Sequence, residues 1–160
     1  DVAPSPRDVN TVFVSLNNWQ CGDYKPYIVK STDRGKTWTN ITSNLPDRHD
    51  VWTVLQDHEN GNLLFAGTEF GLFVSVDGGG RWVQMKGGMP VIQVRDMAFQ
   101  KRENDLVLGT FDAVGDHQLS SVGVQPSSAR ARAFVARRDV GRGARGAGRP
   151  EGSAGRARRV

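Results

Sequence analysis

The sequence predicts an all-β chain, and three observations support this. Short segments rich in β-branched and aromatic residues recur along the chain, and turn residues separate them at intervals of about 8 to 12 positions. No longer stretch combines helical periodicity with a cap, so we expect a helix content near zero. The expected strands cover residues 11–15, 27–30, 51–55, 62–66, 71–75, 82–85, 94–99 and 105–108.

The chain also repeats itself. Residues 28–38 (IVKSTDRGKTW) align with residues 72–82 (LFVSVDGGGRW), which places Asp33 and Asp77 44 residues apart. A period of this length, made of short strands, is typical of a propeller blade with four strands. Residues 9–110 then supply about two and a half blades, fewer than the roughly four of a closed propeller. The predicted fold is an incomplete β-propeller, whose uncovered apolar faces and strand edges predict self-association.

Each repeat contains the pattern Ser-x-Asp-x-Gly-x-x-Trp, and every position has a structural explanation. The Ser and Asp side chains bond the backbone of the turn, and the glycine supplies a positive φ. The tryptophan begins the returning strand and fills the space between adjacent blades. The residues with these expected structural roles are Ser31, Asp33, Gly35, Trp38, Ser75, Asp77, Gly79 and Trp82.

This pattern resembles the Asp-box, or bacterial neuraminidase repeat, of β-propeller proteins. Residues 24–38 and 64–75 look most like the large bacterial sortilin-like proteins often labelled glycosyl hydrolases, and the resemblance covers about residues 9–110. It implies a non-catalytic binding or scaffold module from an exported, extracytoplasmic propeller. The alternative is a fragment of a sialidase- or xyloglucanase-like glycoside hydrolase whose active site needs further blades, so enzymatic activity stays open.

Charge and composition divide the chain into an expected linker at residues 1–8, the blades at 9–110 and a tail at 111–160. Residues 1–110 hold 11 of the 21 Lys and Arg and 13 of the 17 Asp and Glu, whereas the tail holds 10 Arg, 4 acids and no Lys. Its Arg/Gly/Ala-rich composition predicts disorder. Two origins stay open: a genuine basic arm that binds nucleic acid, or an out-of-frame end, which the abrupt change after Thr110 favours.

Catalytic residues stay unassigned. A glycosidase usually needs two carboxylates across a cleft, and the sequence offers several acids but singles out no pair: Asp23, Asp50, Asp57, Glu59, Glu69, Asp96, Glu103 and Asp105. No cofactor or metal site is predicted, because residues 57–62 (DHENGN) lack the alternating carboxylates of a calcium loop. No apolar run approaches the ~18 residues that predict a membrane-spanning helix.

Residues 17–27 are the segment best suited to ligand binding. They form an insertion relative to the second repeat, where Glu69, Phe70 and Gly71 join the corresponding strands. Long propeller loops with aromatic and polar side chains bind sugars or peptides. The candidate ligand-binding residues are Trp19, Asp23, Tyr24, Glu69 and Phe70. The competing interpretation is a loop that packs between blades. The expected partners are a carbohydrate or peptide ligand and the remaining blades of a larger propeller.

Overall fold

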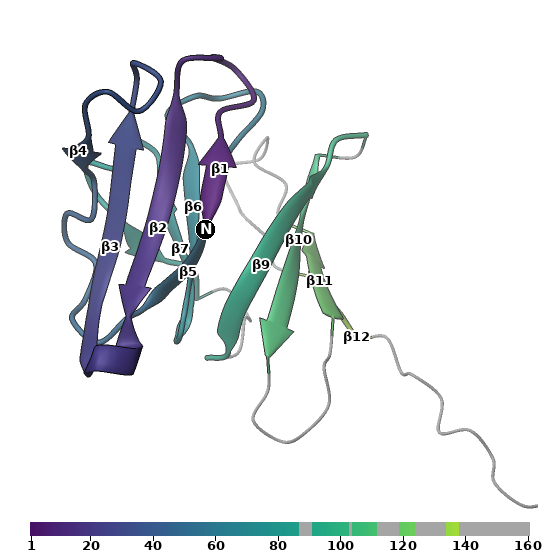
Figure 1. Cartoon of the computed structure of the whole chain (residues 1–160). Helices are drawn as coiled ribbons and strands as arrows, with labels where there is room; N and C mark the ends of the chain where they lie inside the picture. The colour runs from purple at the N-terminus through teal and green to yellow at the C-terminus, as the bar shows by residue number, and fades with distance from the viewer. Residues whose placement is uncertain (87–90, 103, 112–118, 124–133, 138–160) are drawn as a thin grey trace, which may run out of the picture.

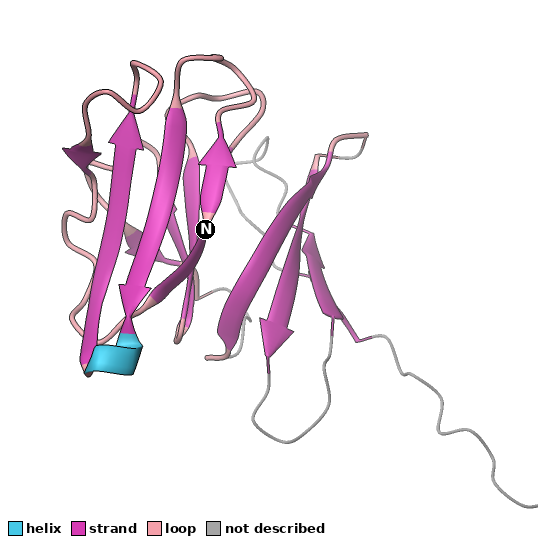
Figure 2. Cartoon of the chain, viewed as in Figure 1, coloured by secondary structure: helices cyan, strands magenta, loops and turns pink. Residues whose placement is uncertain are grey.

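The chain folds into three antiparallel sheets of four strands (Figures 1 and 2). The computed structural model describes residues 1–86, 91–102, 104–111, 119–123 and 134–137. The first sheet contains β1 (Val2–Pro4), β2 (Val12–Asn18), β3 (Asp23–Ser31) and β4 (Thr39–Asn40). The second contains β5 (Val51–Gln56), β6 (Leu64–Thr68), β7 (Gly71–Ser75) and β8 (Val83–Gln84). The third contains β9 (Gln93–Gln100), β10 (Asp105–Phe111), β11 (Leu119–Gly123) and β12 (Phe134–Arg137).

In each sheet the strands pair in sequence order, which is the organisation of a propeller blade. The prediction of an all-β, incomplete propeller is confirmed. The helical structure in the described residues is one short 3-10 turn, η1 (Trp19–Cys21). None of the described residues belongs to a helix long and apolar enough to cross a membrane.

Two segments outside residues 9–110 contribute strands that the sequence analysis did not assign. The expected linker at residues 1–8 contains β1, which pairs with β2 so that Val2 lies opposite Val14. Within the tail at 111–160, where composition indicated disorder, the structure places β11 and β12. With these strands, the structure has three four-stranded sheets, compared with the two and a half blades expected from the sequence. Most of the tail lies outside the described residues.

The second sheet is buried on both faces. Leu64, Ala66 and Phe73 pack on one side against the first sheet, in a cluster that includes Phe13 and Ile28. Phe65 and Leu72 pack on the other side against residues of the third sheet, in a second cluster. Because successive residues of a strand point to opposite faces, one central sheet can join both clusters. This explains why every residue of β6 is buried.

The two repeated turns contain the same hydrogen bonds. In the first, the Ser31 hydroxyl donates to Asp33 at 2.8 Å and accepts the Gly35 N–H at 2.8 Å. In the second, Ser75 donates to Asp77 at 2.7 Å and accepts the Gly79 N–H at 2.9 Å. Asp33 and Asp77 also accept the N–H groups of Thr37 and Arg81. The two glycines have φ values of 83° and 99°, which only glycine adopts without strain.

The tryptophans of the two repeats lie in different environments. Trp82 is 2% exposed and belongs to the cluster between the first and second sheets, as expected for a residue that fills the space between blades. Trp38 was expected to do the same, but it is 47% exposed. The difference arises because Trp82 has the preceding sheet to pack against, whereas the described residues place no sheet before the first one.

Residues 17–27, expected as a loop, mostly extend the hairpin of β2 and β3. The two strands continue past a register shift between Leu16 and Asn18 until Asn18 lies opposite Asp23. The 3-10 turn η1 and Gly22, with a φ of 77°, close the hairpin. The extension carries Trp19 and Tyr24 beyond the end of the sheet core, where both are about half exposed.

Candidate functional site

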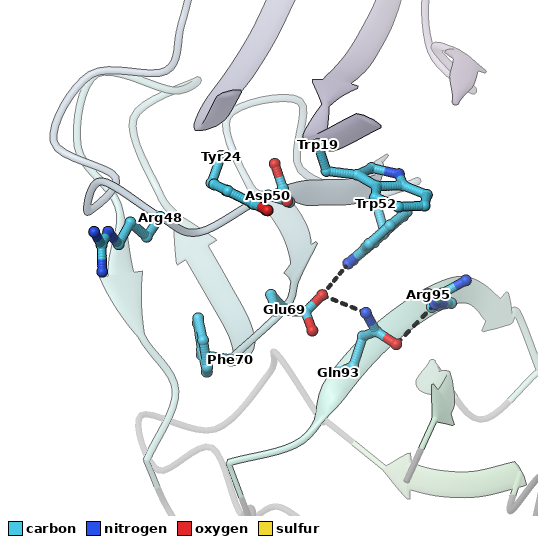
Figure 3. Close-up of a pocket in the computed structure, with 9 residues that line it drawn as sticks. All are labelled: Trp19, Tyr24, Arg48, Asp50, Trp52, Glu69, Phe70, Gln93 and Arg95. Carbon is cyan, nitrogen blue, oxygen red and sulfur yellow. Dashed lines mark hydrogen bonds between the residues drawn. The ribbon is translucent and has the colours of Figure 1, made fainter. Parts of the chain in front are cut away.

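A cavity of about 540 Å³ lies at the end of the sheets where this extended hairpin projects (Figure 3). All three sheets contribute to its wall. Trp19 and Tyr24 come from the first sheet, and Gln93 and Arg95 come from β9 of the third. The second sheet supplies the residues around the start of β5 and the turn between β6 and β7, which are Arg48, Asp50, Trp52, Glu69 and Phe70.

Aromatic rings form the accessible part of the wall. Trp19, Tyr24 and Phe70 are 45%, 50% and 42% exposed, respectively. Phe70 is held by an edge contact with the ring of His49, whose centroid lies 5.0 Å away. Partly exposed aromatic side chains beside a cavity offer flat apolar surfaces on which a ligand can stack.

Two acidic residues, Asp50 and Glu69, lie side by side in the cavity wall. The backbone N–H of Glu69 donates to the carbonyl of Asp50 at 3.1 Å, which continues the ladder between β5 and β6 by one step. The Glu69 carboxylate accepts the indole N–H of Trp52 at 3.0 Å and a bond from the Gln93 amide (Figure 3). Glu69 is therefore fixed by side chains from two sheets.

Asp50 is 4% exposed, and its Oδ1 has no hydrogen-bond partner. Burial raises the pKa of this carboxyl group, and the charges of Glu69 and Asp23 raise it further. A buried carboxyl with an unused oxygen beside a cavity is costly to the folded state. Such groups are concentrated at binding and catalytic sites, where a ligand supplies the missing partner.

Two arginines line the cavity at opposite edges (Figure 3). Arg48 is exposed and has a positive φ of 65°. The Arg95 guanidinium lies 4.2 Å from the centre of the Trp52 ring and donates to the Gln93 side-chain oxygen at 2.8 Å. Arg95, Gln93, Glu69 and Trp52 thus form one connected network along one side of the cavity.

Four of the five candidate ligand-binding residues meet at this cavity: Trp19, Tyr24, Glu69 and Phe70. Asp23 is not among its lining residues. The Asp23 carboxylate accepts the Tyr27 hydroxyl at 2.7 Å and the Lys25 N–H at 3.2 Å, so its local role is to hold the hairpin next to its turn. Both hydrogen bonds lower the pKa of Asp23, and the bond from Tyr27 has the larger effect.

Sequence reasoning did not assign Arg48, Asp50, Trp52, Gln93 or Arg95 to this site. A partial signal existed, because Asp50 and Trp52 are two residues apart at a strand start and so point to the same side. No comparable signal links Gln93 and Arg95 to Glu69, since these residues come from different repeats. Their proximity results from the packing of the third sheet against the second.

The other acids considered as catalytic candidates lie elsewhere. Asp57 is buried and accepts the N–H groups of Glu59 and Asn60 at 3.0 and 2.6 Å, which makes residues 57–60 an Asp-stabilised turn. Glu103 lies outside the described residues. In the described part of the chain, no three His, Cys, Asp or Glu residues converge at metal-binding distances.

Comparison with known proteins relates the chain to others through its fold. No protein-family model matches it, and no curated protein matches its sequence. An ancestral GH74 enzyme is similar in structure, with 24% identity over 69% of this chain and a TM-score of 0.57. The GH74 xyloglucanase from Xanthomonas campestris is also similar, with 18% identity over 77% of this chain and a TM-score of 0.55. The chain covers only 13% and 20% of the lengths of these proteins. It therefore has a β-propeller fold like that of GH74 glycoside hydrolases and corresponds to a small part of them.

Proposed function

We propose that the chain is a non-catalytic, carbohydrate-binding part of a larger β-propeller of the Asp-box, sortilin-like kind. The observation that carries the proposal is the cavity itself, in which exposed aromatic rings stand beside a small number of fixed polar groups. Sugars are bound in this way, with their apolar ring faces on aromatic side chains and their hydroxyls on amide and charged groups. The size of the cavity suits a ligand of one to a few sugar rings.

Each side chain has a role in this proposal. Trp19, Tyr24 and Phe70 provide the stacking surfaces, since they are the exposed aromatic residues of the wall. Glu69 and Gln93 are held in place by their mutual hydrogen bond and accept or donate bonds to hydroxyl groups. Arg48 and Arg95 lie at opposite edges of the cavity and Asp50 lies between them, so a bound sugar ring meets polar groups on both edges (Figure 3).

The proposal is tested by oligosaccharide binding. The chain is titrated by calorimetry with soluble β-glucan, xyloglucan and glucosamine-based oligosaccharides, and then Trp19→Ala and Tyr24→Ala are compared. Each substitution is expected to weaken binding of the retained sugar at least tenfold, because it removes a stacking surface. Trp38→Ala is the matched control, since Trp38 is as exposed as Trp19 but does not line the cavity. Absence of binding to every saccharide, by a chain shown to be folded, contradicts the proposal.

The second candidate function is part of a glycoside hydrolase site, and the observation that favours it is the pair of acids. A raised pKa is what a general acid requires, and Asp50 has both that shift and a neighbouring carboxylate on Glu69. The two structural neighbours are GH74 enzymes, and one of them is a xyloglucanase. Turnover of xyloglucan or a chromogenic glycoside by the full-length parent, lost in Asp50→Asn, supports this candidate. Binding without turnover supports the first.

A further inference from the structure

The face of the first sheet that is turned away from the second sheet is apolar. Phe13 and Ile28 belong to the cluster between these two sheets, so the residues that alternate with them in β2 and β3 point the other way. Cross-strand pairing brings these residues together, because Val14 lies opposite both Val2 and Val29. We call this surface the outer face, and its residues are Val2, Val12, Val14, Leu16, Tyr27 and Val29.

The outer face has the composition of a buried surface. Val2 and Leu16 are 65% and 52% exposed, and the other four residues are partly exposed. In an antiparallel sheet with one solvated face, polar residues alternate with apolar ones, but residues 12–14 and 27–29 are apolar on both faces. In the repeat, Val29 corresponds to Phe73, which is buried against the first sheet. A contiguous apolar surface of this kind is typical of an interface.

Among the described residues, neither of the other sheets covers the outer face. The first sheet packs on the second through β5, whose Val51 and Val54 lie on the opposite face in the cluster with Phe13. Figure 1 shows the third sheet on the other side of the molecule. The outer face is therefore available to a partner.

The far face of the third sheet does not match the outer face in chemistry. Met97 of β9 belongs to the cluster between the second and third sheets, so Asp96, Ala98 and Gln100 point to the far face, and all three are exposed. If a second copy packed its outer face here, the Asp96 carboxylate would lose water without gaining a donor from the apolar residues. Two outer faces match better, because apolar surface is then buried on both sides of the contact.

We propose that the outer face joins two copies of this chain in a symmetric dimer, in which the two first sheets pack face to face. In such an interface the same patch is used by both copies, and the contact closes at two copies. Side chains of facing sheets interdigitate in a layer about 10 Å thick, as in a β-sandwich. This inference is independent of the proposed carbohydrate binding, and it identifies the surface through which the self-association expected from the sequence occurs.

The proposal is tested by sedimentation equilibrium of the full chain over a range of concentrations. We expect a reversible equilibrium between monomer and dimer. Val14→Lys places a charge in the middle of the outer face and is expected to raise the dissociation constant at least about tenfold, because two like charges then meet in the interface. Near-UV circular dichroism checks that the variant is folded. If it is not, Leu16→Lys, at a more exposed position of the same face, takes its place.

Two control variants carry the same lysine on other surfaces. Val83 is 60% exposed in β8 of the second sheet, and Ala98 is exposed on the far face of the third sheet, so Val83→Lys and Ala98→Lys are expected to dimerise like the wild type. If Val83→Lys weakens the dimer as much as Val14→Lys does, the association is non-specific and the proposal is wrong.

Two further results would overturn the proposal. If Ala98→Lys weakens association, or if the assemblies grow beyond two copies as the concentration increases, the copies associate head to tail. If the wild type stays monomeric at every concentration, the outer face does not bind a second copy, and its partner is a different protein segment such as a further propeller sheet.

Discussion

The indole N–H of Trp82 donates a hydrogen bond of 2.8 Å to the carbonyl oxygen of Ile41, 41 residues earlier in the chain. The bond joins the turn of the second repeat to the end of the first sheet. Two more hydrogen bonds join the same parts of the chain. The Asn44 side chain accepts the backbone N–H of Trp82 at 2.7 Å and donates to the Trp82 carbonyl at 2.9 Å. The second repeat is thus fastened to the first sheet through Trp82.

The first prediction compares the two tryptophans of the repeats. Trp82→Ala is expected to lower the free energy of unfolding by about 3 to 5 kcal/mol, because it opens a cavity between the sheets and leaves the Ile41 carbonyl unpaired. Trp38→Ala is expected to cost much less, since that side chain is half exposed. Urea denaturation measures both. Equal losses would show that the two residues have equivalent packing and that the observed difference in exposure is wrong.

The second prediction concerns the contact between the second and third sheets at Gly67. A methyl group on this residue would lie 2.7 Å from the Thr53 side chain and 2.8 Å from the Val94 carbonyl. Because backbone cannot move aside easily, Gly67→Ala is expected to destabilise the chain by about 1 to 3 kcal/mol. At Gly61 the nearest atoms belong to the flexible Arg7 side chain, at 3.3 Å, so Gly61→Ala is the control with little expected effect. A tolerated Gly67→Ala would argue against this packing.

The third prediction is an acid sensitivity of the first repeated turn. Hydrogen bonds from the Thr37 side chain and backbone, and then from Ser31, lower the pKa of Asp33 to about 2. A carboxyl group whose pKa is depressed by folding stabilises the folded state above its unfolded pKa of about 3.9. That contribution decreases as the pH falls toward the folded value. Between the unfolded and the folded pKa of Asp33, we expect the free energy of unfolding to fall more steeply for the wild type than for Asp33→Asn. Urea denaturation at several pH values measures both. If the stabilities of the two proteins change with pH in parallel, this prediction is wrong.

The fourth prediction has the opposite sign and concerns Asp50. Burial and then the Glu69 and Asp23 charges raise its pKa, so the folded state holds this proton more tightly than the unfolded state does. Stability should therefore increase as the pH falls through the folded pKa, and this gain should stop below the unfolded pKa. Asp50→Asn removes the titrating group and is expected to stabilise the chain at neutral pH. If the variant is less stable there, Asp50 has a partner in the folded state that its contacts do not show.

The local features of the fold follow from the sequence. Alternation of apolar and polar residues identifies a strand wherever one face is buried, and the 44-residue period of the Asp33 and Asp77 turns indicates the blade. The sequence also explains these turns, because the Ser and Asp side chains form hydrogen bonds with groups only two to four residues away. Four strands lie outside the ranges predicted from the sequence: β1, which has three residues, β4, which has two, and β11 and β12, which lie in an Arg-rich segment. Their composition does not distinguish them from loops, and pairing with a neighbour defines them.

Some features of the candidate site follow from the sequence, and others depend on the tertiary structure. The sequence by itself determined that residues 17–27 are an insertion with aromatic side chains, and that Glu69 and Phe70 occupy the corresponding turn of the next repeat. Only the tertiary structure decided that Trp19, Asp50, Glu69 and Gln93 share one cavity, since they come from three sheets whose spacing depends on side-chain packing. It also decided that Trp82 is buried and Trp38 exposed, although both occupy the same position in the repeat. The physical reason is that a strand pattern encodes local geometry, whereas burial and charge environment depend on what the neighbouring sheet supplies.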